Sequence, residues 1–411
     1  MARPGVLRRS IVKVAAGAAL LPFGKGAWAA TAERGPQRLI VILLRGAVDG
    51  LSVIVPYADP AYYQARPTIA IAPPGSRDGA LALEPRFGLH PALASLMPLW
   101  RAGGLAFIHA TGSRDPNRSH FEAQRYIENG TPGCSTTADG WMNRLLQALP
   151  GPHGPTEAIS IGPTLPRILN GKAPVANLPL GPDAARPLAI DRSEFVAAFD
   201  RLYAVNDALG EAYREGRSAR AELIGDLERE QRSPDAGAPS AAGFPGQAMQ
   251  LARLIVGDAR IRLAFVALGG WDTHVGQGGS SGLLANRLRP LGEGLAELAR
   301  GLAPIWHDTV IVALSEFGRT VHENADHGTD HGHGNVIWVA GGAVWGGQIY
   351  GEWPGLTPEQ LYQRRDLAIT TDFRAALGVI LRRHLRLADR QLDAVFPGAP
   401  AADTKLMQLF G

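Results

Sequence analysis

The strongest chemical signal in the sequence is a histidine-rich stretch in its last quarter. Four of the 11 histidines fall within twelve residues and are interleaved with two aspartates: His322, Asp326, His327, Asp330, His331 and His333. Imidazole and carboxylate groups gathered this closely are a metal-binding signature. We therefore predict that Asp330, His331 and His333 are metal ligands. The alternative is a solvent-exposed stretch without function.

A second acid–histidine pair lies in Gly270-Trp271-Asp272-Thr273-His274. In extended chain, residues two apart point the same way, so Asp272 and His274 should face one side. A carboxylate and an imidazole there suit a divalent cation such as zinc or manganese. The alternative is a hydrogen-bonded pair on the surface.

Two more carboxylates follow apolar runs. Asp49 comes shortly after the run 38–44, between Gly46 and Gly50, and Glu316 comes directly after the run 309–314. A carboxylate at the end of a buried strand is costly unless it is paired or bound to a metal. Both are therefore candidate site residues. Asp49 could instead cap the next segment, and Glu316 could pair with Arg319.

One serine has the setting of a nucleophile. Ser119 precedes His120 and, with Glu122, forms a Ser-x-x-Glu capping box that opens a helix. A helix N-terminus also favours anions, so Ser119, assisted by His120, could attack a phosphate or sulfate ester. Capping and catalysis would compete for this hydroxyl. The candidate clamps for the anionic oxygens of a substrate are Arg45, Arg118 and Arg319.

These residues need a scaffold that gathers them, and the apolar patterning predicts one. Continuous apolar runs, typical of strands buried on both faces, are Arg38–Leu44, Leu105–Ala110, Ile261–Leu268, Thr309–Leu314 and Val336–Ala340. Helix-like stretches between or after them are Pro91–Arg101, Ser119–Asn129, Glu194–Arg232, Gln247–Asp258, Leu283–Leu302 and Asp372–Leu385. This alternation predicts an α/β fold with a mostly parallel sheet covered on both faces. The ligand site of such a sheet lies beyond the carboxyl ends of its strands.

The first 29 residues read as an export signal. A twin-arginine motif, Arg8-Arg9-Ser10-Ile11-Val12-Lys13, precedes a ten-residue, mostly apolar run and then Ala27-Trp28-Ala29, which predicts cleavage before Ala30. The apolar run is too short for a membrane span. We expect a periplasmic or secreted protein that meets the twin-arginine translocase during export. Residues 30–411 should form a single domain with a flexible connector near 233–246.

Composition excludes several classes. The chain of 411 residues has a net charge of +3, but the leader holds five basic residues and no acid, and what remains is 36 basic against 38 acidic residues. No basic excess is left for nucleic acid. Cys134 is the single cysteine, so no disulfide can form within the chain. No phosphate-binding P-loop or dinucleotide fingerprint is present.

Five motifs together resemble an exported bacterial family, labelled domain of unknown function 1501. They are residues 44–51, 118–121, 270–274, 315–320 and 328–332. The family is similar to the alkaline phosphatase and sulfatase superfamily, which implies a three-layer α/β/α sandwich and up to two metal sites around a nucleophile. The resemblance implies that Asp49, Ser119 and Glu316 hold one metal. It implies that Asp272, His274 and one or both of His331 and His333 hold a second.

The residues and the resemblance predict a metal-dependent hydrolase of phosphate or sulfate esters, small or polymeric, with serine or water as nucleophile. Cys134 lacks the neighbours required for a formylglycine, so that kind of sulfatase is not expected. The rival is a non-catalytic exported binding or scaffold protein that kept the fold. The superfamily often has an acid–histidine pair where this chain reads Glu316-Phe317, and this difference favours the rival.

Overall fold

The computed structural model describes residues 35–151, 153–162, 164–178, 234–402 and 404–410. The predicted leader and the predicted helix at 194–232 lie outside these residues. From Gly35 onward the chain forms one compact unit. No helix in these described ranges is both long and apolar enough to cross a membrane.

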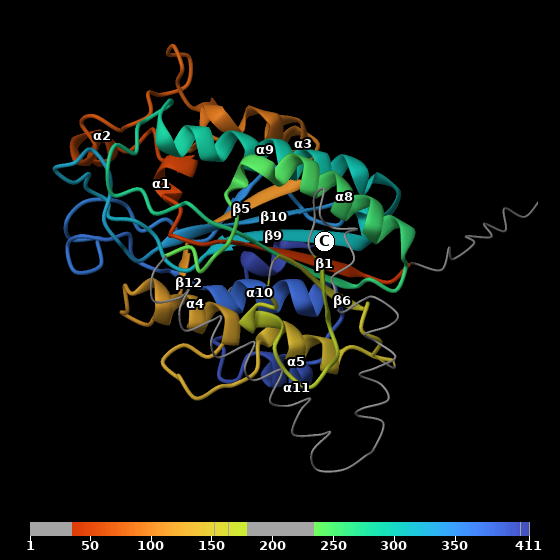
Figure 1. Cartoon of the computed structure of the whole chain (residues 1–411). Coiled ribbons are helices and arrows are strands. Elements are labelled where there is room, and N and C mark those ends of the chain that lie inside the picture. The colour runs from red at the N-terminus through yellow and green to blue at the C-terminus, as the bar shows by residue number, and fades with distance from the viewer. Residues whose placement is uncertain (1–34, 152, 163, 179–233, 403, 411) are drawn as a thin grey trace, which may run out of the picture. The chain divides into compact units, whose positions relative to one another are not determined.

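A central sheet of nine strands organises the described part of this unit (Figure 1). Its strand order is β11-β5-β10-β9-β1-β8-β6-β7, and β12 pairs with β5. The bounds are β1 (Arg38–Leu44), β5 (Leu105–Gly112), β6 (Ala158–Ile161), β7 (Ala176–Leu178), β8 (Leu263–Leu268), β9 (Thr309–Ser315), β10 (Asn335–Gly341), β11 (Ile349–Tyr350) and β12 (Thr371–Asp372). All pairings are parallel except those of β10 with β5 and β9. The mostly parallel sheet and the five strands predicted from apolar runs are therefore confirmed.

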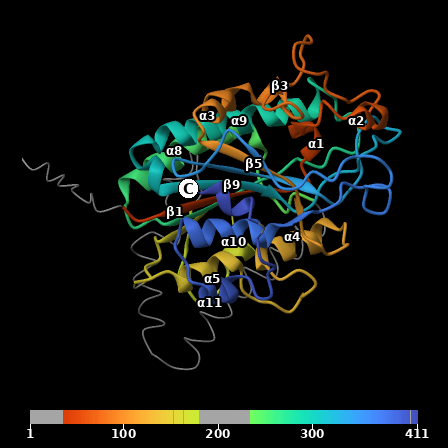
Figure 2. The same cartoon turned by 180° about the vertical axis from the view of Figure 1, so that it is seen from behind.

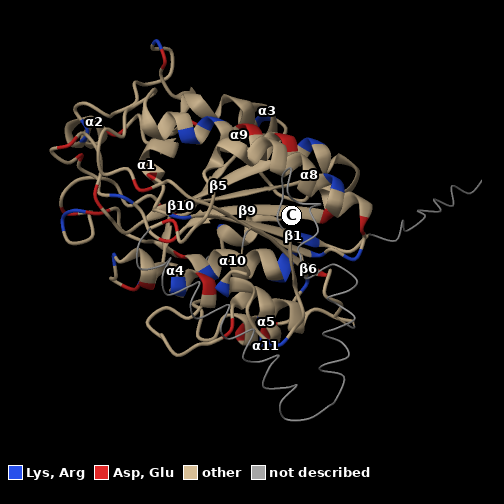
Figure 3. Ribbon diagram, viewed as in Figure 1, with Lys and Arg blue, Asp and Glu red and all other residues tan. Residues whose placement is uncertain are grey.

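Strand β1 shows why these segments are apolar throughout. Every residue of β1 is buried. Successive side chains point to opposite faces of a sheet, so Ile40 and Ile42 join one core cluster while Leu39 and Val41 join the other. Figure 3 shows that the strands in the middle of the sheet carry almost no charged residue. The charges lie on the helices and loops.

Helices cover both faces of the sheet (Figures 1 and 2). On one face lie α3 (Met97–Arg101), α8 (Phe244–Gly257) and α9 (Leu283–Gly301), and on the other lie α4 (His120–Asn129), α5 (Trp141–Ala148), α10 (Phe373–Arg383) and α11 (Asp389–Val395). The expected three-layer α/β/α sandwich is confirmed. A peripheral part contains α1 (Gly50–Val53), α2 (Pro60–Ala65) and a small sheet of β2 (Ile54–Val55), β3 (Leu81–Ala82) and β4 (Gly88–Leu89).

The reversed direction of β10 decides where the site forms. Strands β1, β8 and β9 are parallel and in register, with Leu44 opposite both Leu268 and Ser315, so their carboxyl ends share one edge of the sheet. Because β10 is antiparallel to β9, it begins at that same edge. The histidine-rich stretch joins the end of β9 to the start of β10. It therefore lies beside the loops that follow β1 and β8.

The expected connector near 233–246 is attached to the domain in its described part. Ser240 forms a bridge with Gly269 just after β8. Helix α8 then begins at Phe244, three residues earlier than predicted, and Phe244 is fully buried. Flexibility of this segment stays a prediction.

Candidate metal centre

Three side chains from three different loops meet at the edge of the sheet where β1, β8 and β9 end. They are His120, the first residue of α4, Asp272 in the loop after β8, and His331 just before β10. One possible ligand atom from each lies within 4.8 Å of the other two. We call these residues, together with the adjoining His274, the histidine group. His120 and Asp272 are 152 positions apart in the sequence, and the parallel sheet brings the two together.

The ring nitrogens of the histidine group point at one another. The Nε2 atom of His331 lies 2.9 Å from Nε2 of His120 and 2.9 Å from Nε2 of His274. The Asp272 carboxylate joins them, with 3.0 Å from Oδ1 to His274 Nε2 and 3.4 Å from Oδ1 to His331 Nε2. Three imidazole nitrogens and one carboxylate thus share a small volume.

The opposite nitrogen of each ring faces an acceptor. His120 Nδ1 lies 2.7 Å from Oε1 of Glu316, His274 Nδ1 lies 3.1 Å from Oδ1 of Asp330, and His331 Nδ1 lies 2.9 Å from the carbonyl oxygen of Arg118. A carbonyl or ionised carboxylate cannot donate, so each Nδ1 must carry the proton. In the neutral rings this leaves an unshared electron pair on every Nε2.

Such an arrangement needs positive charge at its centre, because three electron pairs and a carboxylate otherwise repel one another. Burial lowers the pKa of His120, but hydrogen bonds and charge from Asp272 and Glu316 outweigh burial and raise this pKa to about 9. A proton or a metal cation can supply the charge. Histidines fixed through Nδ1 by carboxylates or carbonyls are the usual partners of bound zinc, so the donor set fits a divalent cation.

Asp272 is held in place by Arg319. The Arg319 guanidinium donates to Asp272 Oδ1 at 2.6 Å and also to the Thr329 hydroxyl and carbonyl. Burial raises the pKa of Asp272, but hydrogen bonds from His120, His331 and Arg319 lower it far below its usual range. The side chain of Asp272 keeps 21% of its surface exposed, whereas that of Arg319 is fully buried. Arg319, expected as a substrate clamp, contacts the carboxylate of the group.

Glu316 lies behind His120. Its Oε1 accepts from His120, from the Gly46 backbone amide at 2.8 Å and from Gln124 at 3.0 Å. Burial raises the pKa of Glu316, but hydrogen bonds from His120 and Gln124 and the charge of His120 lower it below the usual value, so the carboxylate is ionised. Gly46 has φ +109°, and a Cβ there would lie 2.7 Å from the Asp272 amide nitrogen, so only glycine fits between the two loops. Glu316 is placed to orient a ligand.

Asp49 does not reach the histidine group. It is fully buried, and its two oxygens accept from Arg66 at 2.6 and 3.0 Å, from Ser52 at 2.7 Å and from Gln277 at 2.7 Å. Ser52 lies in α1, Arg66 directly follows α2, and Gln277 lies in the loop between β8 and α9. The structure thus places Asp49 outside the histidine group, with its oxygens engaged with Arg66, Ser52 and Gln277, and a metal role for Asp49 stays a prediction.

Other predicted site residues also have partners of their own. His333 stacks on Tyr362 with ring centroids 4.3 Å apart, and burial lowers its pKa to about 4. Asp330 contacts His274 rather than the centre of the group. Arg45 pairs with Glu128, and Arg118 pairs with Asp366 at 2.6 Å. The Arg45 guanidinium is buried, whereas that of Arg118 is 26% exposed, and both are engaged with carboxylates of the chain itself.

Ser119 stands beside the histidine group. It is exposed at the N-cap of α4, and its side chain makes no capping hydrogen bond. Glu122, the expected partner in a capping box, contacts Tyr126 and Arg125 instead. Both neighbours of Ser119 are tied to the histidine group. The Arg118 carbonyl accepts from His331, and His120 is a member of the group. The hydroxyl is therefore not engaged in capping.

The sequence reasoning missed two features. His120 was expected to assist Ser119, yet it lies among the ligand atoms, and the helix start next to a serine gave no sign of this. Arg287 was not singled out, although it lies against Gly270 in the loop that carries Asp272. Its position four residues after Leu283, where the helical pattern begins behind a glycine-rich loop, could have raised it as a candidate.

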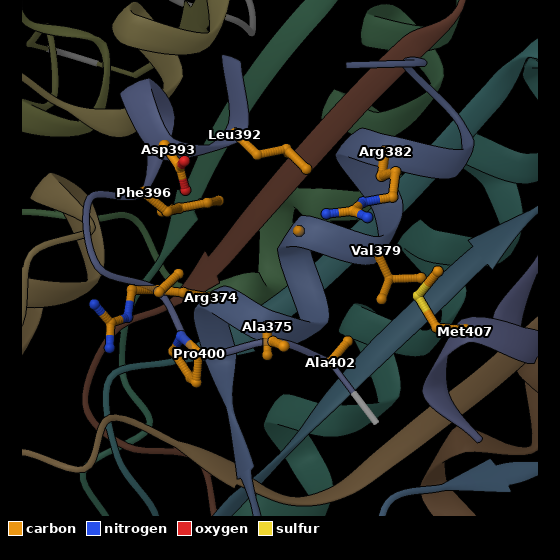
Figure 4. Close-up of a pocket in the computed structure, with 13 residues that line it drawn as sticks. Arg374, Ala375, Val379, Arg382, Leu392, Asp393, Phe396, Pro400, Ala402 and Met407 are labelled. Atoms are coloured by element: carbon orange, nitrogen blue, oxygen red, sulfur yellow. The ribbon is translucent and has the colours of Figure 1, made fainter. Parts of the chain in front are cut away.

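The cavity in Figure 4 is a different place on the described surface. It is lined by residues of α10 and α11 and by Phe396, residues 399–402 and Met407, and it includes none of the histidine group. Its two arginines are paired, Arg374 with Asp372 at 2.9 Å and Arg382 with Asp389 at 2.8 Å. It carries no chemistry comparable to that of the histidine group.

Comparisons with known proteins agree with the family expectation. The model of the family described as "Protein of unknown function (DUF1501)" matches residues 36–396. No curated protein matches the sequence.

Several solved structures show a distant likeness. Ps i-CgsB in complex with k-i-k-neocarrahexaose is 9% identical over 90% of this chain and 75% of its own, with a TM-score of 0.44. PsFucS1 sulfatase from Pseudoalteromonas sp. is 13% identical over 92% and 72%, with a TM-score of 0.39. A protein in the alkaline phosphatase superfamily from Vibrio parahaemolyticus is 12% identical over 75% and 60%, with a TM-score of 0.33. All three TM-scores are below 0.5 and all three identities are below 25%.

Proposed function

The chain belongs to the DUF1501 family, and we propose that it is an exported, metal-dependent hydrolase of phosphate or sulfate esters. The observation that carries the proposal is the convergence of the Nε2 atoms of His120, His274 and His331 on the Asp272 carboxylate. Imidazole-rich donors with one carboxylate favour zinc, and manganese is the second choice. We propose one metal at this centre, since Asp49 is engaged elsewhere.

The residues of the site would have different roles. His120, His331 and Asp272 hold the cation, and His274 completes the donor set. Glu316 and the Arg118 carbonyl fix the orientation of two rings, and Arg319 fixes Asp272. A bound divalent cation would neutralise negative charge on an ester and lower the pKa of a nucleophile.

Ser119 is our first choice of nucleophile. Its hydroxyl is free of the capping bond, and both its neighbours are anchored to the histidine group. The N-terminus of α4 adds unpaired backbone amides and a positive dipole end, which favour an anionic ester. A water molecule is the alternative nucleophile and would need no serine chemistry.

Export places the same site outside the cytoplasm. The twin-arginine pattern of residues 8–13 supports passage through the translocase that carries folded proteins. The metal could then be inserted before export. We propose a periplasmic or secreted enzyme acting on small or polymeric anionic esters.

A non-catalytic binding protein is the second candidate. It is favoured by the ion pairs of Arg45, Arg118 and Arg319, because each expected clamp is engaged with a carboxylate of the chain itself. Such a protein would bind the cation and an anionic partner without turnover.

Metal analysis combined with an ester panel tests the proposal. The purified protein should contain about one equivalent of zinc or manganese, and it should hydrolyse a phosphate or sulfate monoester or diester. Ser119→Ala should abolish turnover while the metal stays bound, and Ser76→Ala, an exposed serine in a distant loop, is the control. Full activity in Ser119→Ala would identify water as the nucleophile. Bound metal without turnover of any ester would favour the binding protein, and protein that takes up no metal would end both proposals.

A further inference from the structure

We propose that Arg287 on α9 is the anion-binding residue of this site and takes the tetrahedral oxyanion of a phosphate or sulfate group. This inference rests on the proposed function and adds the group that recognises the substrate. The arginines near the site differ in whether they have a carboxylate partner. Arg45, Arg118 and Arg319 each have a carboxylate partner.

The Arg287 guanidinium has no such partner among the residues that the structure describes. Its Nη1 is buried, and no hydrogen-bond acceptor contacts it within the described ranges. A guanidinium has five N–H donors, and leaving a buried one unpaired is costly. An anion bound at this place would remove that cost.

The position of Arg287 is set by the loop that carries Asp272. A Cβ on Gly270 would lie 3.4 Å from Cζ and Nε of Arg287, so the guanidinium lies beside Gly270. Gly270 itself has φ +92°, a backbone conformation that favours glycine. Its amide is held by Asp235 at 2.6 Å. Two residues further on, the chain supplies Asp272 to the histidine group.

The electrostatics agree with this placement. Burial lowers the pKa of Arg287, and charge from Asp235 and Asp272 only partly offsets this effect. Both carboxylates therefore act on the guanidinium through their charge. An ester whose oxygen meets the cation at Asp272 could present a second oxygen to Arg287. Planar guanidinium groups bind phosphate and sulfate with paired hydrogen bonds.

Binding of inorganic phosphate and sulfate to the zinc-loaded protein tests this inference without requiring turnover. By isothermal titration calorimetry, Arg287→Gln should weaken phosphate binding about 10- to 100-fold, the loss typical of a charge-assisted hydrogen bond. Arg287→Lys should recover part of the affinity. Arg289→Gln, an exposed arginine two positions along the same helix, is the matched control and should bind as the wild type does. Zinc content and melting temperature should be unchanged in all three variants.

The outcomes separate this inference from the proposed function. Wild-type phosphate and sulfate affinity in folded Arg287→Gln, or no binding of either anion by the zinc-loaded wild type, would overturn the role of Arg287. Arg287-dependent anion binding by a protein that hydrolyses no ester would support the anion site and contradict the hydrolase. If Arg287→Gln does not fold, Arg287→Lys decides: a weaker affinity than wild type supports the role, and an unchanged one overturns it.

Discussion

Two aspartate–arginine pairs, both built on loops at the same edge of the sheet, have opposite surroundings. Asp49 with Arg66 is closed: both side chains are essentially fully buried, and Ser52 and Gln277 add hydrogen bonds to the carboxylate. Asp272 with Arg319 is open: the arginine is buried, but the carboxylate is 21% exposed and faces three imidazole rings. A carboxylate is available to a cation only where its remaining acceptor sites are not taken by fixed donors.

The closed pair supports the open one through a chain of hydrogen bonds. Gln277 donates to Asp49, and its oxygen accepts from the hydroxyls of Thr273 and Thr329. Thr329 in turn accepts from Arg319, which holds Asp272. The Asp49 pair thus belongs to the framework beneath the site rather than to the site itself.

The largest effect on metal content and turnover is expected from a substitution in the histidine group, which faces the open pair. His331→Ala removes the ring that contacts both other imidazoles, so the variant should lose its metal and at least about a thousandfold in ester hydrolysis, because a bound cation contributes several kcal/mol. Metal content and turnover measure this. His327→Ala, on the exposed part of the same loop, is the control. A His331→Ala protein that keeps full metal content would show that the ligands are elsewhere.

A substitution in the closed pair should lower the stability of the fold rather than the metal content. Asp49→Asn leaves the Arg66 charge buried without its partner, so the free energy of unfolding should fall by about 3–5 kcal/mol. The folded fraction should still bind about one equivalent of metal. Urea unfolding followed by metal analysis measures both. The control is Asp78→Asn at an exposed ion pair, where little change is expected. Loss of metal without loss of stability would reverse the assignment of the two aspartates.

Glu316→Gln should have an intermediate effect on metal binding by the histidine group. The amide retains the shape of the side chain but no longer holds the His120 Nδ1 proton with a negative charge, so metal affinity should fall about 10- to 100-fold. Competition with a zinc chelator gives the affinity. The same affinity as in the wild type would mean that Glu316 does not orient a ligand.

Low pH should reduce the contribution of the closed pair to the free energy of unfolding. Burial raises the pKa of Asp49, but Arg66, Ser52 and Gln277 outweigh burial, and the net pKa lies below its usual value. The stabilisation is therefore complete above the unfolded pKa near 3.9 and is lost as pH falls through the folded pKa. The stability gap between wild type and Asp49→Asn should narrow in that range. A gap that is constant down to pH 2 would contradict this account.

The smallest effect is expected at His333. This ring stacks on Tyr362 and is held neutral by burial, away from the histidine group. His333→Phe should preserve the stacking, the metal content and the turnover. A loss of metal in this variant would return His333 to the ligand set.

The sequence predicted the middle of the fold well, because a strand buried on both faces must be apolar throughout. β1, β5, β8, β9 and β10 were all found from that pattern. The short strands β6 and β7 and the helices α5 and α11 were not predicted. Their apolar stretches are short, as in the eight-residue α5, and packing against neighbours stabilises them.

The site was predictable in composition but not in pairing. Residue types and spacing indicated Asp272, His274 and His331. What spacing could not give was the partner of each charge, such as Arg66 for Asp49, because those contacts join segments that only the folded chain brings together. The antiparallel direction of β10, which delivers His331 to the right edge, is likewise a property of the whole sheet.

X-ray absorption spectroscopy of the protein loaded with one equivalent of zinc tests the central claim most directly. The account predicts imidazole nitrogens at about 2.0–2.1 Å together with carboxylate oxygen, and fewer imidazoles in His331→Ala. A zinc environment that does not change in His331→Ala, or a wild-type protein that releases its zinc on gel filtration, would contradict it.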